Sequence, residues 1–278
     1  MNPHAERSGS PASLVRTLVV HRAMIFQMAR REVVGRYQGS VFGLAWSFFN
    51  PILMLAVYTF VFSVVFKARW TAGPDVGESR TQFAVILFAG MIVHGLLAEM
   101  MNRAPGLVLG NVNYVKKVVF PLEILPVVTA LSTLFHTAIS LTVLVVAFWL
   151  FHGYLHWTTL LVPMVFLPLI LLGLGLSWLL ASLGVFLRDV GQVVVILTTV
   201  LMFLSPVFYP LSAIPEGLQS LVMLNPLTFI IEQARAVLVF GHLPDWFGLA
   251  AYMLCALLIA WAGYFWFQRT RRGFADVL

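Results

Sequence analysis

The sequence predicts an all-α integral membrane protein with about six transmembrane helices, and three observations lead to this fold class. Hydrophobic residues make up 60% of the 278 residues and charged residues only 10%, whereas a soluble domain is about 45–50% apolar and about 25% charged. Long intervals of the chain carry no charged residue, and the lysines and arginines gather between these intervals. A lipid bilayer is therefore the expected solvent.

The first segment, residues 1–40, is basic and is expected to lie in the cytoplasm. Its first 36 residues carry six arginines and no long apolar run, so we expect no cleavable signal peptide. Residues 14–37 mix these arginines with Leu, Val, Met and Phe, which is typical of an amphipathic helix at the membrane surface. Phe26, Val33 and Tyr37 would share one face of this helix.

The next segment, residues 41–268, is expected to be the transmembrane domain, and residues 269–278 a cytoplasmic tail. A spanning helix needs about 20 mostly apolar residues. The charge-free interval Ile124–Leu187 is too long for one span, and the polar and aromatic stretch 152–157 divides it into two. The six expected spans lie within Tyr37–Phe66, Thr81–Ala98, the two halves of 124–187, Val190–Pro215 and Trp246–Gln268.

Residues 210–243 are apolar but too interrupted for a regular span. Prolines, glycines and the charged residues Glu216, Glu232 and Arg235 break this stretch. Irregular backbone at membrane depth must be buried in protein or line a cavity. We therefore expect short re-entrant helices on the outer side, before the last span.

The distribution of lysine and arginine orients the chain. Cytoplasmic loops of membrane proteins carry an excess of these residues. With both termini in the cytoplasm, all but four of the 17 lie inside, the exceptions being Lys67, Arg69, Arg80 and Arg235. The net charge of +6 is then explained by topology and by contact with anionic membrane lipid, so we expect no nucleic acid partner.

The sequence shows no catalytic, nucleotide-binding or metal-binding motif. No lysine follows a glycine, which excludes a Walker A motif. Cys255 is the only cysteine, and the histidines lack metal-ligand spacing. His94 and His136 fall in or near spans, where a histidine either packs through a hydrogen bond or has a functional role. Glu99 and Glu123 sit at helix ends, and acids avoid the span centres, which argues against an ion-coupled transporter. We expect no cofactor in this chain and an energy source outside it.

Four stretches together resemble the ABC-2 type permeases that export O-antigen, capsule and teichoic acid chains. The first runs from Arg30 through Gly43-Leu44 and Trp46 to Asn50-Pro51; the others are VKKVVFPLEILP at 115–126, FLRDV at 186–190, and SPVFYP at 205–210 followed by NPL at 225–227. They occur in the order found in that family.

The resemblance implies a homodimeric, multi-pass permease of the bacterial inner membrane. Two ATP-binding subunits, which hold ATP and Mg, would drive export of a polyprenyl-pyrophosphate-linked polysaccharide. The motifs do not distinguish O-antigen, capsule and teichoic acid. An ABC-2 exporter of a small drug or lipid shares this topology and is the alternative, and an ion-coupled transporter is a further one.

Four groups of candidate residues follow from the motifs and their positions. Coupling to the ATP-binding subunits would involve Arg30, Arg31, Arg36, Asn111, Asn113, Arg188 and Asp189. Uptake of the lipid-pyrophosphate head would involve Arg36, Lys116 and Lys117, unless the lysines only anchor the chain. Sugar rings would pass over Trp46, Phe49, Tyr58 and Phe62, unless these only pack against lipid. The outer gate would involve Pro206, Tyr209, Asn225 and Pro226.

Overall fold

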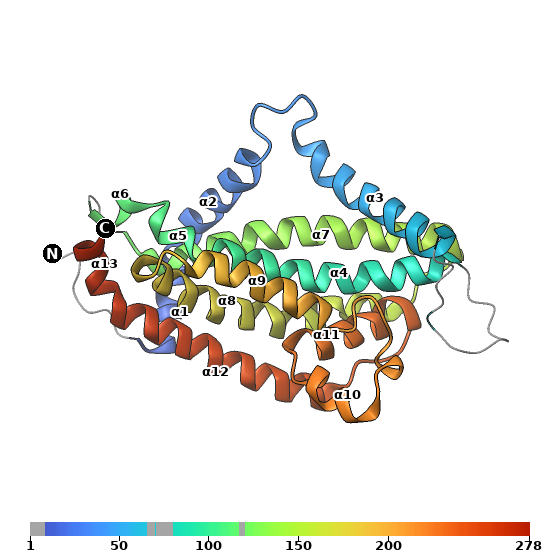
Figure 1. The fold of residues 1–278 in the computed structure, drawn as a ribbon. Helices are drawn as coiled ribbons and strands as arrows, with labels where there is room; N and C mark the ends of the chain where they lie inside the picture. The colour runs from blue at the N-terminus through green and yellow to red at the C-terminus, as the bar shows by residue number, and fades with distance from the viewer. Residues whose placement is uncertain (1–8, 66–69, 71–79, 117–119) are drawn as a thin grey trace.

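The computed structural model describes residues 9–65, 70, 80–116 and 120–278, and all regular structure within these ranges is helical, as predicted. Figure 1 shows a long bundle of roughly aligned helices. Five helical segments in the described ranges are long and apolar enough to cross a membrane, or up to six if one bent pair counts as a span. The five contain α3 (Trp46–Tyr58), α4 (Arg80–Arg103), α7 (Leu125–His152), α8 (Val162–Phe186) and α12 (Trp246–Thr270).

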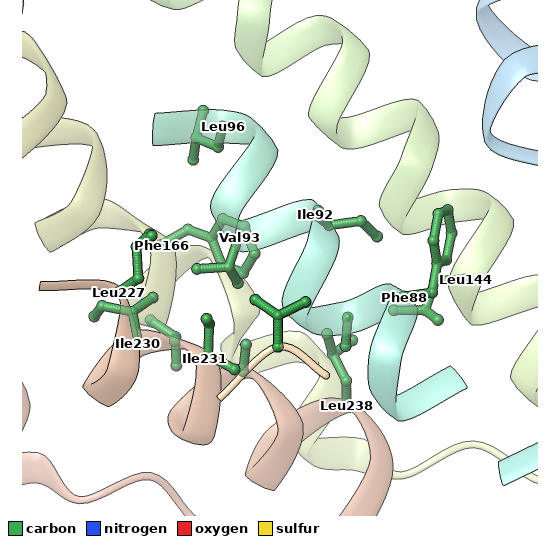
Figure 2. Packing of buried hydrophobic residues seen from close by; sticks show 14 of the residues in the cluster. Phe88, Ile92, Val93, Leu96, Leu144, Phe166, Leu227, Ile230, Ile231 and Leu238 are labelled. Atoms are coloured by element: carbon green, nitrogen blue, oxygen red, sulfur yellow. The ribbon is translucent and has the colours of Figure 1, made fainter. Parts of the chain in front are cut away.

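Helix α4 forms the centre of the bundle. Every residue from Phe83 to Ala89 is at most 5% exposed. The helix packs against α7, α8 and α11 (Pro226–Arg235), and a helix that is apolar on all sides is expected to be enclosed by others. Figure 2 shows side chains from all four helices in this core, among them Ile92, Leu144, Phe166 and Ile231.

Helices α8 and α12 touch through their backbones. A Cβ atom added to Gly263 would lie 2.1 Å from the carbonyl oxygen of Gly175, and one added to Gly175 would lie 2.6 Å from that of Ile259. Small residues let helices in membranes approach this closely. These two glycines therefore allow α8 and α12 to pack backbone against backbone.

The N-terminal helices α1 (Pro11–Val20) and α2 (Arg22–Gly35) cross the bundle near one of its ends (Figure 1). Helix α2 packs on α7, and its buried residues are Ile25, Ala29 and Val33, spaced four apart as one helical face requires. Phe26, which the sequence placed on the same face as Val33, is 68% exposed. Figure 1 shows α2 and α3 leaving the bundle obliquely and meeting at a connection above it.

The expected fifth span does not form one long helix. Helix α9 (Val190–Phe203) has 14 residues, which is about 21 Å at 1.5 Å per residue and less than the roughly 30 Å of a hydrocarbon core. It stops before Pro206, since proline lacks an amide donor and disfavours helix in the residue before it. Two shorter helices follow: α10 (Glu216–Met223) and then α11, which continues as a π-helix to Phe240. This pair is bent by 96°.

The two described ends of the chain lie at the same end of the bundle. Figure 1 shows α1, α5 (Gly106–Leu109), α6 (Val112–Lys116) and α13 (Phe274–Val277) there, whereas α10 and α11 lie toward the opposite end. We call these the termini end and the far end.

A buried ion pair holds the termini end together. Arg271 donates to Glu123 over 2.7 Å and to the carbonyl oxygen of Phe120 over 2.7 Å. The two charged side chains are 8% and 0% exposed. The indole of Trp178 donates to the carbonyl oxygen of Glu123 over 2.9 Å. The end of α12 is thereby joined to the start of α7 and to α8.

Candidate functional site

The termini end brings together coupling candidates from two separate segments of the chain. Arg31 of α2 and Asn111, just before α6, line one cavity of about 260 Å³, together with Glu32 and Tyr114. Asn111 donates from Nδ2 to the carbonyl oxygen of Leu107 over 2.9 Å, which fixes the short loop between α5 and α6. Two further coupling candidates, Arg30 and Asn113, are exposed.

Arg188 and Asp189 occupy the short turn between α8 and α9. Both side chains are exposed, and neither lines the cavity of Arg31 and Asn111. Asp189 is the N-cap of α9, yet its carboxylate accepts no capping hydrogen bond from that helix. The acid therefore has no capping function that would explain its place in the turn.

A second cavity, of about 240 Å³, lies between α3, α4 and α7, and we call it the α3–α4–α7 cavity. Arg36 and Glu99 line it at the side nearer the termini end. Tyr58 and Phe88, whose ring centroids are 6.4 Å apart, line it toward the far end. His136 of α7 also lines it, with its ring against that of Tyr37. The cavity therefore changes from charged to apolar along its length.

Four alternating charges join α2 to α4 beside this cavity. Arg36 pairs with Glu99, and Arg103 pairs with Glu32. Arg103 also lies 3.5 Å from Glu99, which links the two pairs. The four side chains are 25–41% exposed, and pairs this accessible to water contribute only about 0.2–1 kcal/mol each. The network can therefore open at low cost, unlike the buried Arg271–Glu123 pair.

The sequence leaves the roles of His94 and His136 open, and the structure shows that their surroundings differ. His94 donates from Nε2 to the carbonyl oxygen of Thr198 over 3.0 Å, so it joins α4 to α9. His136 has Nδ1 3.4 Å from the hydroxyl of Tyr37. Its Nε2 is buried without a hydrogen-bond partner among the described residues. His94 thus has a packing contact, whereas His136 lines the cavity through a ring whose Nε2 is itself buried.

The structure separates the cationic candidates for the lipid-pyrophosphate head. Arg36 lines the α3–α4–α7 cavity, whereas Lys116 is exposed at the end of α6 and does not. Lys117 lies outside the described residues. Arg36 is therefore the one cation among the described candidates that a ligand in this cavity could reach.

The four aromatic candidates, three on α3 and Phe62 on the π-helix Thr59–Val65 that continues it, fall into two groups. Trp46 and Phe49 are exposed and have ring centroids 5.9 Å apart. Tyr58 and Phe62 instead pack inward on α4, with the ring of Phe62 stacked 5.6 Å from that of Phe83. The candidates do not form a single stripe along the helix.

The outer-gate candidates converge around the ends of α9 and α11. Asn225 donates from Nδ2 to the carbonyl oxygen of Leu201 over 3.0 Å and caps α11 by accepting from the amide of Leu227 over 3.0 Å. Tyr209 donates to the carbonyl oxygen of Phe203 over 2.9 Å. Pro206 is buried, and Pro226 begins α11, as expected for proline in the first turn.

Arg235 supports this region, and the sequence had indicated it only as an outward-facing charge. It is 0% exposed. It donates to the carbonyl oxygens of Ile86 and Val207 over 3.1 and 2.9 Å and to Glu232 over 2.9 Å. Its guanidinium lies 4.3 Å from the ring centroid of Trp70. The signal available was the i, i+3 spacing of Glu232 and Arg235 inside an apolar stretch, because buried charges in membranes are paired.

Comparisons with known proteins match most of the chain. A family model described as ABC-2 type transporter matches residues 24–239. The chain is 29% identical over 265 residues to the O-antigen export system permease protein RfbA of Myxococcus xanthus, covering 95% of this chain and 98% of that protein. It is 22% identical over 258 residues to RfbA of Klebsiella pneumoniae, covering 92% and 95%. It is 24% identical over 252 residues to the polysialic acid transport protein KpsM of Escherichia coli, covering 88% and 93%.

Proposed function

The chain belongs to the ABC-2 type transporter family, and from this premise we propose that it is the membrane permease of an exporter for lipid-linked polysaccharide. The observation that carries the proposal is the near full-length similarity to permeases named for O-antigen export and polysialic acid transport. The sequence contains no Walker A motif. The energy for export would therefore come from ATP hydrolysis in a separate subunit, which holds the ATP and Mg.

In the working assembly, two copies of this chain pair with two ATP-binding subunits in a bacterial inner membrane. The termini end faces the cytoplasm, and α1 and α2 lie near the membrane surface. The exposed Arg30, Asn113 and Arg188 support contact with the ATP-binding subunits at this end. At the far end, α10 and α11 act as re-entrant helices, which their 96° bend supports.

The lipid-linked chain enters from the cytoplasm and leaves at the far end. Arg36, Lys116 and Lys117 receive the pyrophosphate head. Sugar rings then pass over exposed aromatic rings of α3, for which the Trp46–Phe49 pair provides an accessible surface. The outer side closes where Asn225 holds α11 against α9.

Deleting the gene in a glycan-producing host tests this function. Surface polysaccharide should disappear and lipid-linked polysaccharide should accumulate inside the cell, because synthesis continues without export. The measurement is surface glycan together with lipid-extracted intracellular glycan, and a plasmid copy of the gene should restore both. Normal surface glycan in the deletion strain would instead support an exporter of a small drug or lipid.

A companion strain separates ATP-driven from ion-coupled transport. It carries the intact permease and a partner subunit whose Walker A lysine is replaced. The proposal expects the same loss of surface glycan as in the deletion strain. Continued export in this strain would show that the permease does not depend on ATP hydrolysis.

A further inference from the structure

The α3–α4–α7 cavity has the polarity of an amphipathic molecule. Glu99 and Phe88 lie on the same helix and are separated by three turns, or about 16 Å at 1.5 Å per residue. One end offers Arg36 and Glu99, and the other offers Tyr58 and Phe88. An anionic head attached to a hydrocarbon chain matches this change from charged to apolar surface.

The size of the cavity limits what can occupy it. Its volume of about 240 Å³ is below the roughly 300–1,000 Å³ of pockets that enclose a whole drug-sized ligand. A polysaccharide chain is larger than this space. A phosphate-bearing head with the first part of its lipid does, and the rest of the lipid would extend from the apolar end into the bilayer.

The lining also presents polar atoms that are ready for a phosphate. His136 lies beside these atoms, with its Nδ1 3.4 Å from the hydroxyl of Tyr37, although its own Nε2 is buried away from the cavity. The neighbouring Tyr37 hydroxyl and the Arg36 guanidinium line the same space. The guanidinium can donate to two phosphate oxygens and the Tyr37 hydroxyl to a third, with Nδ1–H of His136 donating to that hydroxyl.

Arg36 is already paired with Glu99, and this pair determines how a ligand could bind. Arginine forms the same forked hydrogen bonds with carboxylates and with phosphates, so a phosphate and Glu99 compete for one guanidinium. If Arg36 turns to a phosphate, Glu99 still has Arg103 at 3.5 Å. After this exchange, Arg36 is paired with the phosphate and Glu99 with Arg103, so neither charge is left without a partner.

We propose that this cavity binds the phosphate head of the exported polyprenyl-linked polysaccharide and that Glu99 blocks Arg36 until the head arrives. This inference rests on the proposed function and adds to it a location and a switch for substrate recognition. Arg36 directly follows α2, the helix assigned to contact with the ATP-binding subunits. Release of the Arg36–Glu99 pair would thus signal an occupied site to that helix.

A binding experiment on the purified permease in lipid nanodiscs tests the switch. The probe is a polyprenyl pyrophosphate, and the measurement is its dissociation constant by native mass spectrometry. Glu99→Gln should bind the probe about two- to five-fold more tightly than wild type, the gain expected from removing a partly exposed competing pair. Glu216→Gln, which removes the same charge from exposed α10, should match wild type.

A gain in affinity cannot result from misfolding, so Glu99→Gln remains informative even if other variants are unstable. Arg36→Gln should lose most of the binding. Equal dissociation constants for wild type and Glu99→Gln would overturn the proposed competition, and absence of binding to every form would overturn the site.

Two further probes identify the source of the phosphate. Polyprenol, which lacks phosphate, and inorganic pyrophosphate, which lacks lipid, should both bind more weakly than polyprenyl pyrophosphate. Inorganic pyrophosphate binding as tightly as the lipid would overturn the assignment to a lipid head. Absence of probe binding by a permease that restores surface glycan in the deletion strain would overturn this site alone. Tight probe binding by a permease whose deletion leaves surface glycan normal would overturn the export function instead.

Discussion

At the scale of single residues, Arg235 joins three parts of the chain through one guanidinium. It lies on α11 and donates to α4 at Ile86 and to the loop after α9 at Val207. Arg235→Met should lower the unfolding free energy by about 1–3 kcal/mol, the cost of leaving buried acceptors without donors. Arg235→Lys should recover only part of this, since an ammonium cannot reproduce the planar fork.

The measurement is the melting temperature of the purified protein in detergent. Arg188→Met is the matched control, because Arg188 is exposed and such changes usually stay within about 0.5 kcal/mol. Equal melting temperatures for the two methionine variants would show that the hydrogen bonds of Arg235 do not stabilise the fold.

At the scale of elements, a substitution in the turn between α8 and α9 can distinguish a coupling role from a structural role. Asp189 is exposed and makes no capping bond to α9, so Asp189→Ala should change stability by less than about 0.5 kcal/mol. If the turn contacts the ATP-binding subunit, export should nevertheless fall sharply. Surface glycan measured at matched permease levels tests this.

Glu216→Ala is the control for that experiment. Glu216 is also an exposed acid at the start of a helix, but it lies on α10, away from the termini end. Its replacement should leave export unchanged. Normal export by the Asp189→Ala protein would remove this acid from the coupling surface.

At the scale of the whole molecule, the positions of the connections predict the membrane topology. The α7–α8 connection and the α8–α9 turn lie at opposite ends of α8, and α12 begins toward the far end and finishes at the termini end. Reporter fusions should read outside after residues 72, 154 and 243, and inside after residues 112, 190 and 278. A C-terminal fusion that reads outside would contradict an even number of crossings.

The membrane class and most of the helices were predictable from the sequence because both depend on local properties. Charge-free intervals predicted α3, α4, α7, α8 and α12. The fifth expected span was wrong as a single helix, since hydropathy continues through Pro206 whereas helical hydrogen bonding does not. The 210–243 stretch was correctly expected to be broken, although the bend of its helices could not be derived.

The candidate site was predictable only in part. The first motif indicates Arg36, and the sequence places Glu99 and His136 near span ends or in spans, but it does not indicate that the three residues converge. Arg36 and Glu99 are 63 residues apart, and Tyr37 and His136 are 99 apart. No local pattern indicates contacts at such separations. For Arg235 only the i, i+3 spacing with Glu232 is local, and its contacts with Ile86 and Val207 are 149 and 28 residues away.

The sequence by itself determined that this chain resides in a bilayer, which intervals can cross it and which end carries the positive charge. Each of these properties depends on one segment facing lipid or water, so neighbouring residues suffice to establish it. The tertiary structure alone decided that Arg36 meets Glu99, that Arg271 meets Glu123 and that Arg235 is enclosed. Those contacts depend on how helices rotate and pack against one another, and packing is decided between segments rather than within them.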